Sequence, residues 1–221
     1  MEQIEIEAFW RDTIGLNHSE LLNEVVKNSS TWNVRRRDIL VREREKLSDI
    51  PFLITGAAKS YSFDANGKEK VLCFTYLPGE PVTSIYRLDQ EISSVCTIEI
   101  IQDGTLLFIP LELLNNLVAN HLEAAHIYEG MLSRSLEKVV QRDWALASCT
   151  APERYEWFER SYPGLSKIAS KKDIAAFLNM SSESLSRILK LYGEKRELTL
   201  ESDPGQSQSI FDWAGQCCGS G

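Results

Sequence analysis

The chain has 221 residues, enough for one large or two small domains, and its 43% hydrophobic and 25% charged residues are typical of a soluble globular protein. No apolar run approaches the roughly 20 residues of a membrane helix, and the acidic start MEQIEIEAFWRD is unlike a secretory signal. The five cysteines form no C-x-x-C pair, and their odd number indicates a reducing compartment, so we expect a cytoplasmic protein with no membrane partner.

The charge is distributed unevenly along the chain. The formal net charge is -8, yet Ser166 to Leu200 holds seven Lys or Arg against four Asp or Glu, a local charge of +3. The remainder therefore carries -11. Because local charge sets the attraction to phosphates, nucleic acid remains a possible partner of this basic segment.

The first 110 residues predict helices followed by a β domain. Residues 2–28 have a helical pattern, interrupted at Gly15 and Asn17, with Ser19 as a cap for the second part. Asn66-Gly67 predicts a hairpin, and Pro78-Gly79 and Asp103-Gly104 predict further turns. Short β-branched and aromatic runs between such turns are typical of an antiparallel jelly roll. The strand candidates are RDILVRE, FLITGAAKSYSF, KVLCFTYL, SSVCTIEII and TLLFIP.

A long helix is predicted for residues 111–147, following Pro110. Apolar residues spaced by three and four form a narrow seam along it, in which Glu129 and Asp143 are the polar exceptions. The seam either packs on the chain's own β domain or forms a two-helix dimer contact, and its narrowness on so long a helix favours the dimer. The predicted dimer residues are Leu122, Ala125, Leu132, Leu136 and Val139.

Residues 148–200 predict a small helical domain, and residues 201–221 a poorly ordered tail. Thr150, Ser170 and Ser181 are the expected N-caps of three successive helices. In the tail, the vicinal Cys217-Cys218 pair is either a thiol sensor or, as we favour, a free pair in a loose segment.

The segment 170–190, SKKDIAAFLNMSSESLSRILK, has the spacing of a helix-turn-helix. A short turn separates two helices whose apolar residues can face each other, so the polar side of the second helix points outward. A solvated helical hairpin is the alternative. Arg187 can pair with guanine and Glu183 can accept from cytosine. We expect base contacts from Ser182, Glu183, Ser186 and Arg187, and phosphate contacts from Lys171, Lys172, Ser181, Ser184 and Lys190.

The segment ERYEWFERSYPGLSKIASKKDIAAFLNMSSESLSRILK resembles the C-terminal half of the cyclic-AMP receptor and fumarate-nitrate regulator (Crp/Fnr) superfamily of bacterial transcription factors. FLITGAAKSYSFDANGKEKVLCFTYLPGE resembles the glycine-marked strands of its effector-binding jelly roll. Glu183, Ser186 and Arg187 match the E-x-x-S-R pattern of the fumarate-nitrate branch.

This resemblance, over residues 20–192, implies an α+β protein with a cyclic-nucleotide-binding-like jelly roll, a long dimerisation helix and a winged-helix-like helix-turn-helix domain. It also implies a homodimer that reads a pseudo-palindromic, TTGA-like operator in double-stranded DNA and contacts RNA polymerase.

The effector site departs from the family pattern. Thr83-Ser84 and Ser94 stand where the cyclic-nucleotide receptors have a glycine-glutamate pair and an arginine that bind the phosphate. A buried phosphate without its cation loses several kcal/mol, so we expect no cyclic-AMP binding. An unknown small effector, or none, is expected instead. Candidate pocket residues are Tyr61, Phe63, Phe74, Tyr76, Ser84 and Ser94.

No cofactor or metal is expected. An iron-sulfur cluster requires N-terminal cysteines, whereas the first cysteine here is Cys73. His121 and His126 are five residues apart and share a helix face poorly. An enzyme is disfavoured because no histidine falls in a predicted strand and no nucleophile elbow, phosphate loop or HExxH motif occurs. A Crp-like protein-binding module without specific DNA recognition is the alternative, since KRELTL at 195–200 is only a fragment of a wing.

Overall fold

A computed structural model describes residues 3–83 and 93–200 of the chain, the last eight of these by backbone alone. The expected pocket residue Ser84 and the expected tail 201–221 lie outside the described residues. No helix within the described ranges is long and apolar enough to cross a membrane.

The N-terminal helices pack as a cap on the sheet. They are α1 (Gln3–Ala8), the π-helical turn η1 (Phe9–Ile14) and α2 (Ser19–Asn28). Gly15 ends η1 with a left-handed φ of 91°, which confirms the predicted break. The N-cap position of α2 is His18, so the expected cap at Ser19 is wrong by one residue. Trp10 lies edge-on to Phe52 of the sheet, with 5.4 Å between ring centroids.

The β region forms one five-stranded antiparallel sheet with the order β1-β5-β3-β4, in which β2 also pairs with β5. This confirms the antiparallel β domain. The strands are β1 (Ser30–Val34), β2 (Ile39–Val41), β3 (Asp49–Phe63), β4 (Glu69–Thr75) and β5 (Thr97–Pro110). The strands β3 and β4 are joined at the predicted Asn66-Gly67 turn, where Gly67 has a φ of 72°.

The predicted turn at Asp103-Gly104 is wrong. Both residues lie within β5, so the two strand candidates on either side of them form one continuous strand. The register between β3 and β5 shifts between Leu53 and Ala58, and Gly104 lies against Thr55 and Gly56 in this stretch. Glycine here permits a close approach of two backbones instead of a chain reversal.

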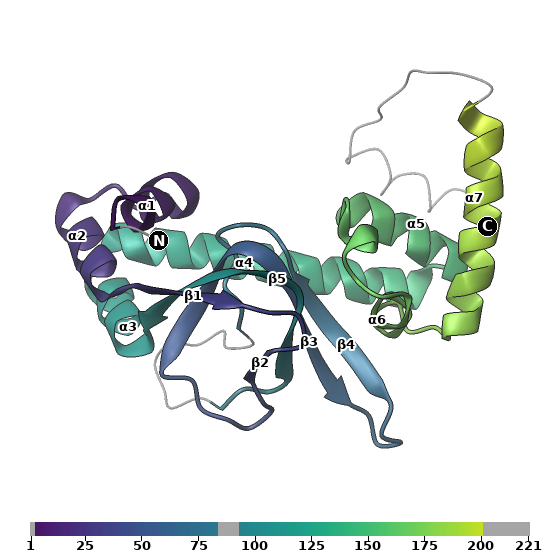
Figure 1. The fold of residues 1–221 in the computed structure, drawn as a ribbon, viewed down its shortest axis with the longest axis horizontal. Coiled ribbons are helices and arrows are strands. Elements are labelled where there is room, and N and C mark those ends of the chain that lie inside the picture. The colour runs from purple at the N-terminus through teal and green to yellow at the C-terminus, as the bar shows by residue number, and fades with distance from the viewer. Residues whose placement is uncertain (1–2, 84–92, 201–221) are drawn as a thin grey trace.

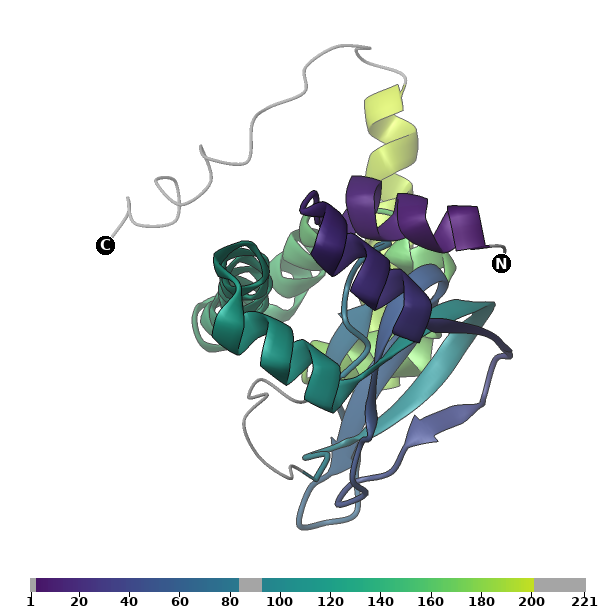
Figure 2. The same cartoon turned by 90° about the vertical axis from the view of Figure 1, so that its left-hand side faces the viewer.

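Two helices replace the single predicted one after Pro110. α3 (Leu111–Asn120) ends at His121, whose extended backbone (φ -130°) separates it from α4 (Leu122–Ser148). In Figure 1, α1, α2 and α3 lie near one end of α4, and the C-terminal helices lie near the other. Figure 2 views α4 nearly along its axis, beside the sheet.

The C-terminal helices begin at the predicted caps. They are α5 (Ala151–Ser161), the 3-10 turn η2 (Leu165–Lys167), α6 (Lys171–Phe177) and α7 (Ser182–Leu200). The backbone N–H of Thr150 donates to Glu153, and the Ser170 and Ser181 hydroxyls accept from Asp173 and Ser184. Residues 195–200 continue α7, so KRELTL is helical and supplies no strand of a wing.

The C-terminal helices and the sheet share one hydrophobic core. Phe74 of β4 is fully buried, and its ring centroid lies 5.1 Å from that of Phe177 in α6 and 6.4 Å from that of Phe158 in α5. Val71 and Ala57 of the sheet belong to the same cluster. α6 therefore packs directly on the sheet, whereas α7 packs mainly on α5 and α6.

Candidate nucleic-acid interface

The turn between α6 and α7 brings their apolar faces together. Asn179 takes the left-handed conformation (φ 51°), and the N–H of Met180 donates to the carbonyl of Ala175 at 2.9 Å. Asparagine tolerates this conformation better than most residues. The side chains that face inward are buried, as their spacing predicts: Ile174, Ala175, Leu178, Leu185 and Ile188.

The opposite side of α7 is exposed to solvent and polar. All four residues expected to contact bases, and the phosphate candidate Lys190, are exposed on it: Ser182, Glu183, Ser186, Arg187 and Lys190. Three further phosphate candidates are exposed around the start of the two helices: Lys171, Lys172 and Ser181. Ser184 is only half-buried and lies 3.1 Å from the Ser181 hydroxyl, inside the cap.

Glu183 is held ionised at the start of α7. Its own backbone N–H and the Ser181 hydroxyl lower the pKa of its carboxyl group. Arg187, one turn further along, lowers this pKa in the same direction. An ionised carboxylate at this position is an acceptor only, which suits the amino group of cytosine.

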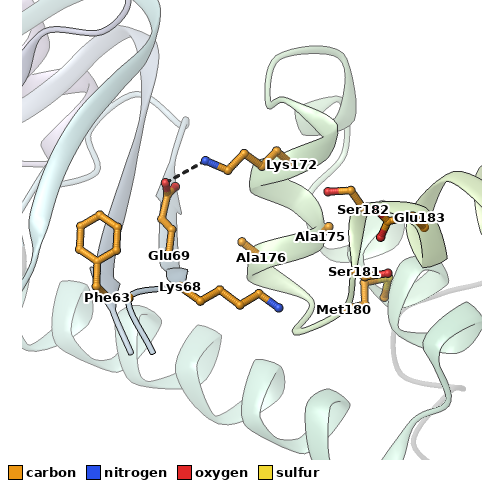
Figure 3. Close-up of a pocket in the computed structure, with 11 residues that line it drawn as sticks. Phe63, Lys68, Glu69, Lys172, Ala175, Ala176, Met180, Ser181, Ser182 and Glu183 are labelled. Atoms are coloured by element: carbon orange, nitrogen blue, oxygen red, sulfur yellow. Dashed lines mark hydrogen bonds and ion pairs between the residues drawn. The ribbon is translucent and has the colours of Figure 1, made fainter. Parts of the chain in front are cut away.

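A cleft of about 460 Å³ opens between the β3–β4 hairpin and the α6–α7 pair. Figure 3 shows Lys68 and Glu69 on the hairpin side, facing Lys172 and Ala176 of α6, with Phe63 also on the hairpin. The beginning of α7, with Ser181, Ser182 and Glu183, completes the lining. The expected DNA-contacting face of α7 therefore starts at the rim of a cleft whose opposite wall is the β3–β4 hairpin.

A buried ionic cluster joins the sheet to α6. Lys59 of β3 is only 6% exposed, and its Nζ lies 2.8 Å from Glu69, 2.7 Å from Asp173 and 3.5 Å from Glu99. Burial by itself lowers the pKa of Lys59, but hydrogen bonds to Asp173 and Glu69 outweigh burial and raise that pKa above its ordinary value. Lys59 is therefore charged at any physiological pH.

Arg142 of α4 forms a second connection between the sheet and α6. Its guanidinium group donates to the carbonyls of Phe177 and Val71 and lies 4.7 Å above the ring of Phe177. Burial lowers the pKa of Arg142, although an arginine stays charged regardless. The long helix, β4 and the end of α6 thus meet at one side chain.

The sequence patterns missed both connections. The partners of Lys59 lie 10 and 114 residues away in the chain, at Glu69 and Asp173, and no local spacing links them. A lone lysine in an otherwise apolar and small-residue strand, FLITGAAKSYSF, was the available signal. A buried lysine requires carboxylate partners.

The expected effector residues are dispersed in the structure. Phe74 and Tyr76 point toward the C-terminal helices, where Tyr76 lies 6.2 Å from Tyr162. Tyr61 and Phe63 contact each other on the hairpin, and Phe63 lines the interface cleft. Ser94 is buried elsewhere and donates to the carbonyl of Cys96 at 2.6 Å. Ser84 is outside the described ranges.

The dimer candidates of α4 lie on a face that is largely open to solvent. Leu122 is 72% exposed, Leu136 64% and Val139 53%, whereas Ala125 and Leu132 are half-buried. In the described part of the chain, no group of three or more His, Cys, Asp or Glu side chains is placed to hold a metal.

Comparisons with known proteins agree with the resemblance drawn from the sequence. The family model described as "Cyclic nucleotide-binding domain" matches residues 31–121. No curated protein matches. FixK2 from Bradyrhizobium japonicum has a similar structure at 20% identity and a TM-score of 0.64, covering 82% of this chain and 89% of its own.

Two further solved structures have the same fold. The regulator CLP of Xanthomonas campestris is 16% identical, with a TM-score of 0.64, and the match covers 80% of this chain and 93% of CLP. A transcriptional regulator of the Crp/Fnr family from Eubacterium rectale, described as putative, is 16% identical with a TM-score of 0.65, covering 85% and 87%. At these identities the likeness concerns the fold.

Proposed function

We propose that this protein is a homodimeric, DNA-binding transcription regulator. The proposal starts from its match to a cyclic nucleotide-binding domain and from its fold, which is that of Crp/Fnr regulators. α7 enters the major groove of a pseudo-palindromic operator with TTGA-like arms. Ser182, Glu183, Ser186 and Arg187 read base edges, while Lys171, Lys172, Ser181, Ser184 and Lys190 position the protein on phosphates. It works in the cytoplasm, where DNA and RNA polymerase are available.

The observation that carries this proposal is the division of α7 into two faces. Leu185 and Ile188 are buried against the neighbouring helices, while Arg187 and its polar neighbours are exposed in one row. A recognition helix needs this arrangement, because one side must hold the helix in place while the other enters a groove. The local charge of +3 from Ser166 to Leu200 adds attraction to phosphates.

The exposed apolar face of α4 supports the homodimer. Leu122, Leu136 and Val139 are large apolar side chains that water surrounds in the single chain. Pairing two copies of α4 removes this area from water and generates the twofold axis that a pseudo-palindromic operator requires. We propose Leu122, Ala125, Leu132, Leu136 and Val139 as the contact.

The β domain is proposed to bind an effector other than cyclic AMP, or none. Thr83-Ser84 and Ser94 replace the phosphate-binding residues of the cyclic-nucleotide receptors. The aromatic side chains expected to line a pocket instead pack largely on the C-terminal helices and the hairpin. A regulatory ligand would therefore bind at a site other than the one where the cyclic-nucleotide receptors hold the phosphate.

Selection from a random duplex library, at two salt concentrations, tests the regulator proposal. We expect a pseudo-palindrome with TTGA-like arms to be enriched. Arg187→Ala should weaken binding to it by about thirtyfold or more, because the dimer loses one bidentate base contact in each arm and each is worth about 1–3 kcal/mol. Arg36→Ala, which removes an exposed arginine of the β1–β2 loop, is the matched control and should leave the enriched sequence unchanged.

If no sequence is enriched at either salt concentration, the regulator proposal is contradicted. The alternative, a protein-binding module with the same fold, would then account for the exposed face of α7. If a sequence is enriched equally by Arg187→Ala, α7 is not the reading element, and the site assignment fails while DNA binding stands.

A further inference from the structure

The tip of the β3–β4 hairpin projects from the sheet and is closed by a hydrogen-bonded turn. The register between the two strands shifts between Ser60 and Tyr61, and the tip extends from there to the Asn66-Gly67 turn. The Asp64 carboxylate accepts from the backbone N–H of Asn66 at 2.9 Å and of Lys68 at 3.0 Å. These bonds fix the turn, so Lys68 projects from a defined backbone.

Polar contacts hold the tip beside the α6–α7 pair. Glu69 lies 3.2 Å from Lys172 of α6, and the Nζ of Lys70 donates to Asn179, in the turn between the two helices, at 2.7 Å. Glu69 also accepts from the buried Lys59 at the base of the hairpin. The two walls of the cleft are therefore fixed relative to each other.

The cleft is large enough for part of one nucleic-acid strand, and its charged lining consists of two lysines, Lys68 and Lys172, and two carboxylates, Glu69 and Glu183. Lys68 is exposed on the hairpin wall, and the Lys172 side chain is 72% exposed on the helix wall (Figure 3). Glu69 pairs with Lys172 and shares Lys59 with Glu99 and Asp173, so it opposes an anion less than an isolated carboxylate would. A volume of about 460 Å³ holds roughly one to two nucleotides.

The cleft also lies where a DNA strand would pass. When the start of α7 enters a major groove, the sugar-phosphate backbone at the edge of that groove runs beside the α6–α7 turn. Ser181 and Ser182 at the start of α7 line this same cleft. Phe63, 60% exposed on the opposite side, offers an apolar surface for a sugar.

We propose that the β3–β4 hairpin is a second DNA-binding element, and that Lys68 and Lys172 clamp the phosphates of one strand between the β domain and α6. This inference rests on the proposed function, since the clamped strand borders the groove that α7 reads. The clamp adds affinity without sequence preference, because its cations meet phosphates and not base edges.

Binding of Lys68→Ala to the selected operator and to an unrelated duplex, measured over a series of salt concentrations, tests the clamp. We expect affinity for both duplexes to fall by a similar factor, about fivefold or more, and the slope of log affinity against log salt to decrease by about 2, because the homodimer loses one phosphate contact in each protomer. Lys68→Arg should retain the wild-type values, because it keeps the cation. Lys27→Ala, which removes an exposed lysine at the end of α2, is the control for net charge and should change neither quantity.

Two results would overturn the clamp. Unchanged affinity and slope in Lys68→Ala would show that the tip does not touch DNA, and tighter binding would show that the hairpin obstructs α7. Arg187→Ala, measured in parallel, separates these results from a failure of the regulator proposal. If Arg187→Ala loses the operator while Lys68→Ala does not differ from wild type, only the clamp is wrong. Absence of DNA binding by the unchanged protein contradicts both.

Discussion

Lys59 is the residue on which the connection between sheet and helices depends. It is 6% exposed and lies among three carboxylates, those of Glu69, Glu99 and Asp173. Lys59→Met keeps most of the side-chain volume but leaves these carboxylates together without their cation. We expect the free energy of unfolding, measured in urea, to fall by about 3–5 kcal/mol.

The pH dependence of this loss follows from the direction of the shift. The pKa of Lys59 is raised on folding, so its stabilisation is complete below the unfolded lysine pKa of about 10.4 and is lost only as pH rises through the folded value. Lys59 itself should therefore add no pH dependence to the stability of the wild type from pH 6 to pH 9. Lys167→Met, at an exposed position, should stay within about 0.5 kcal/mol of wild type. An equally small effect of Lys59→Met would show that the cluster contributes no net stability.

At the scale of elements, β3 and β5 approach each other closely where Gly104 lies against Thr55 and Gly56. A Cβ atom on Gly104 would overlap the backbone of Thr55. We expect Gly104→Ala to lower the free energy of unfolding by more than about 2 kcal/mol, because the overlapping atoms are backbone and cannot rotate away. Thermal unfolding followed by circular dichroism measures it.

Gly130→Ala is the matched control for that substitution. Gly130 lies in α4, and an added Cβ there would meet only the flexible end of Arg134, at 3.5 Å. Alanine is the better helix former by roughly 1 kcal/mol, so the melting temperature should rise slightly or stay unchanged. If Gly104→Ala behaved in the same way, the close approach of β3 and β5 would not be a constraint on this fold.

Elements whose signals are local could be predicted from the sequence. The Asn66-Gly67 hairpin and the caps at Thr150, Ser170 and Ser181 each depend on residues within four positions. Asp103-Gly104 has the same local chemistry as a turn, but pairing with β1 and β3 keeps it extended. Local chemistry alone cannot distinguish these outcomes, because long-range strand pairing decides between them.

The candidate site likewise has one part that local sequence spacing predicts and one part that only tertiary packing creates. The exposed row of α7 follows from helical spacing, and the sequence predicted it. The hairpin wall of the cleft did not follow, because Lys68 and Ser182 are 114 positions apart and meet only through tertiary packing. The sequence cannot separate Phe74 from a pocket-lining residue, because alternation in a strand gives two faces without saying what covers each.

For the whole molecule, the open face of α4 predicts the state of assembly. Leu136→Glu places a charge on a side chain that is 64% exposed in the single chain and central to the proposed contact. We expect sedimentation equilibrium to show a dimer for the wild type and a monomer for this variant, since a buried unpaired charge costs several kcal/mol. Each monomer would bind only one arm of the operator.

Ser133→Glu adds the same charge to the same helix, at an exposed position outside the seam. It should remain dimeric and bind the complete operator. A dimer of undiminished strength in Leu136→Glu would place the contact elsewhere and favour the other interpretation of the seam, in which it packs against its own chain.

The single core shared by β4, α5 and α6 limits how the C-terminal helices can be exchanged between related proteins. Phe74 packs against Phe158 and Phe177, and Lys59 pairs with Asp173. The β domain and the C-terminal helices therefore each bury some of their side chains against the other. A chimera that exchanged the C-terminal helices for those of a distant relative would place unmatched side chains against both Phe74 and Lys59. A functional recombination point between related proteins therefore cannot separate the sheet from the C-terminal helices. The residues on the two sides of their shared core must change together.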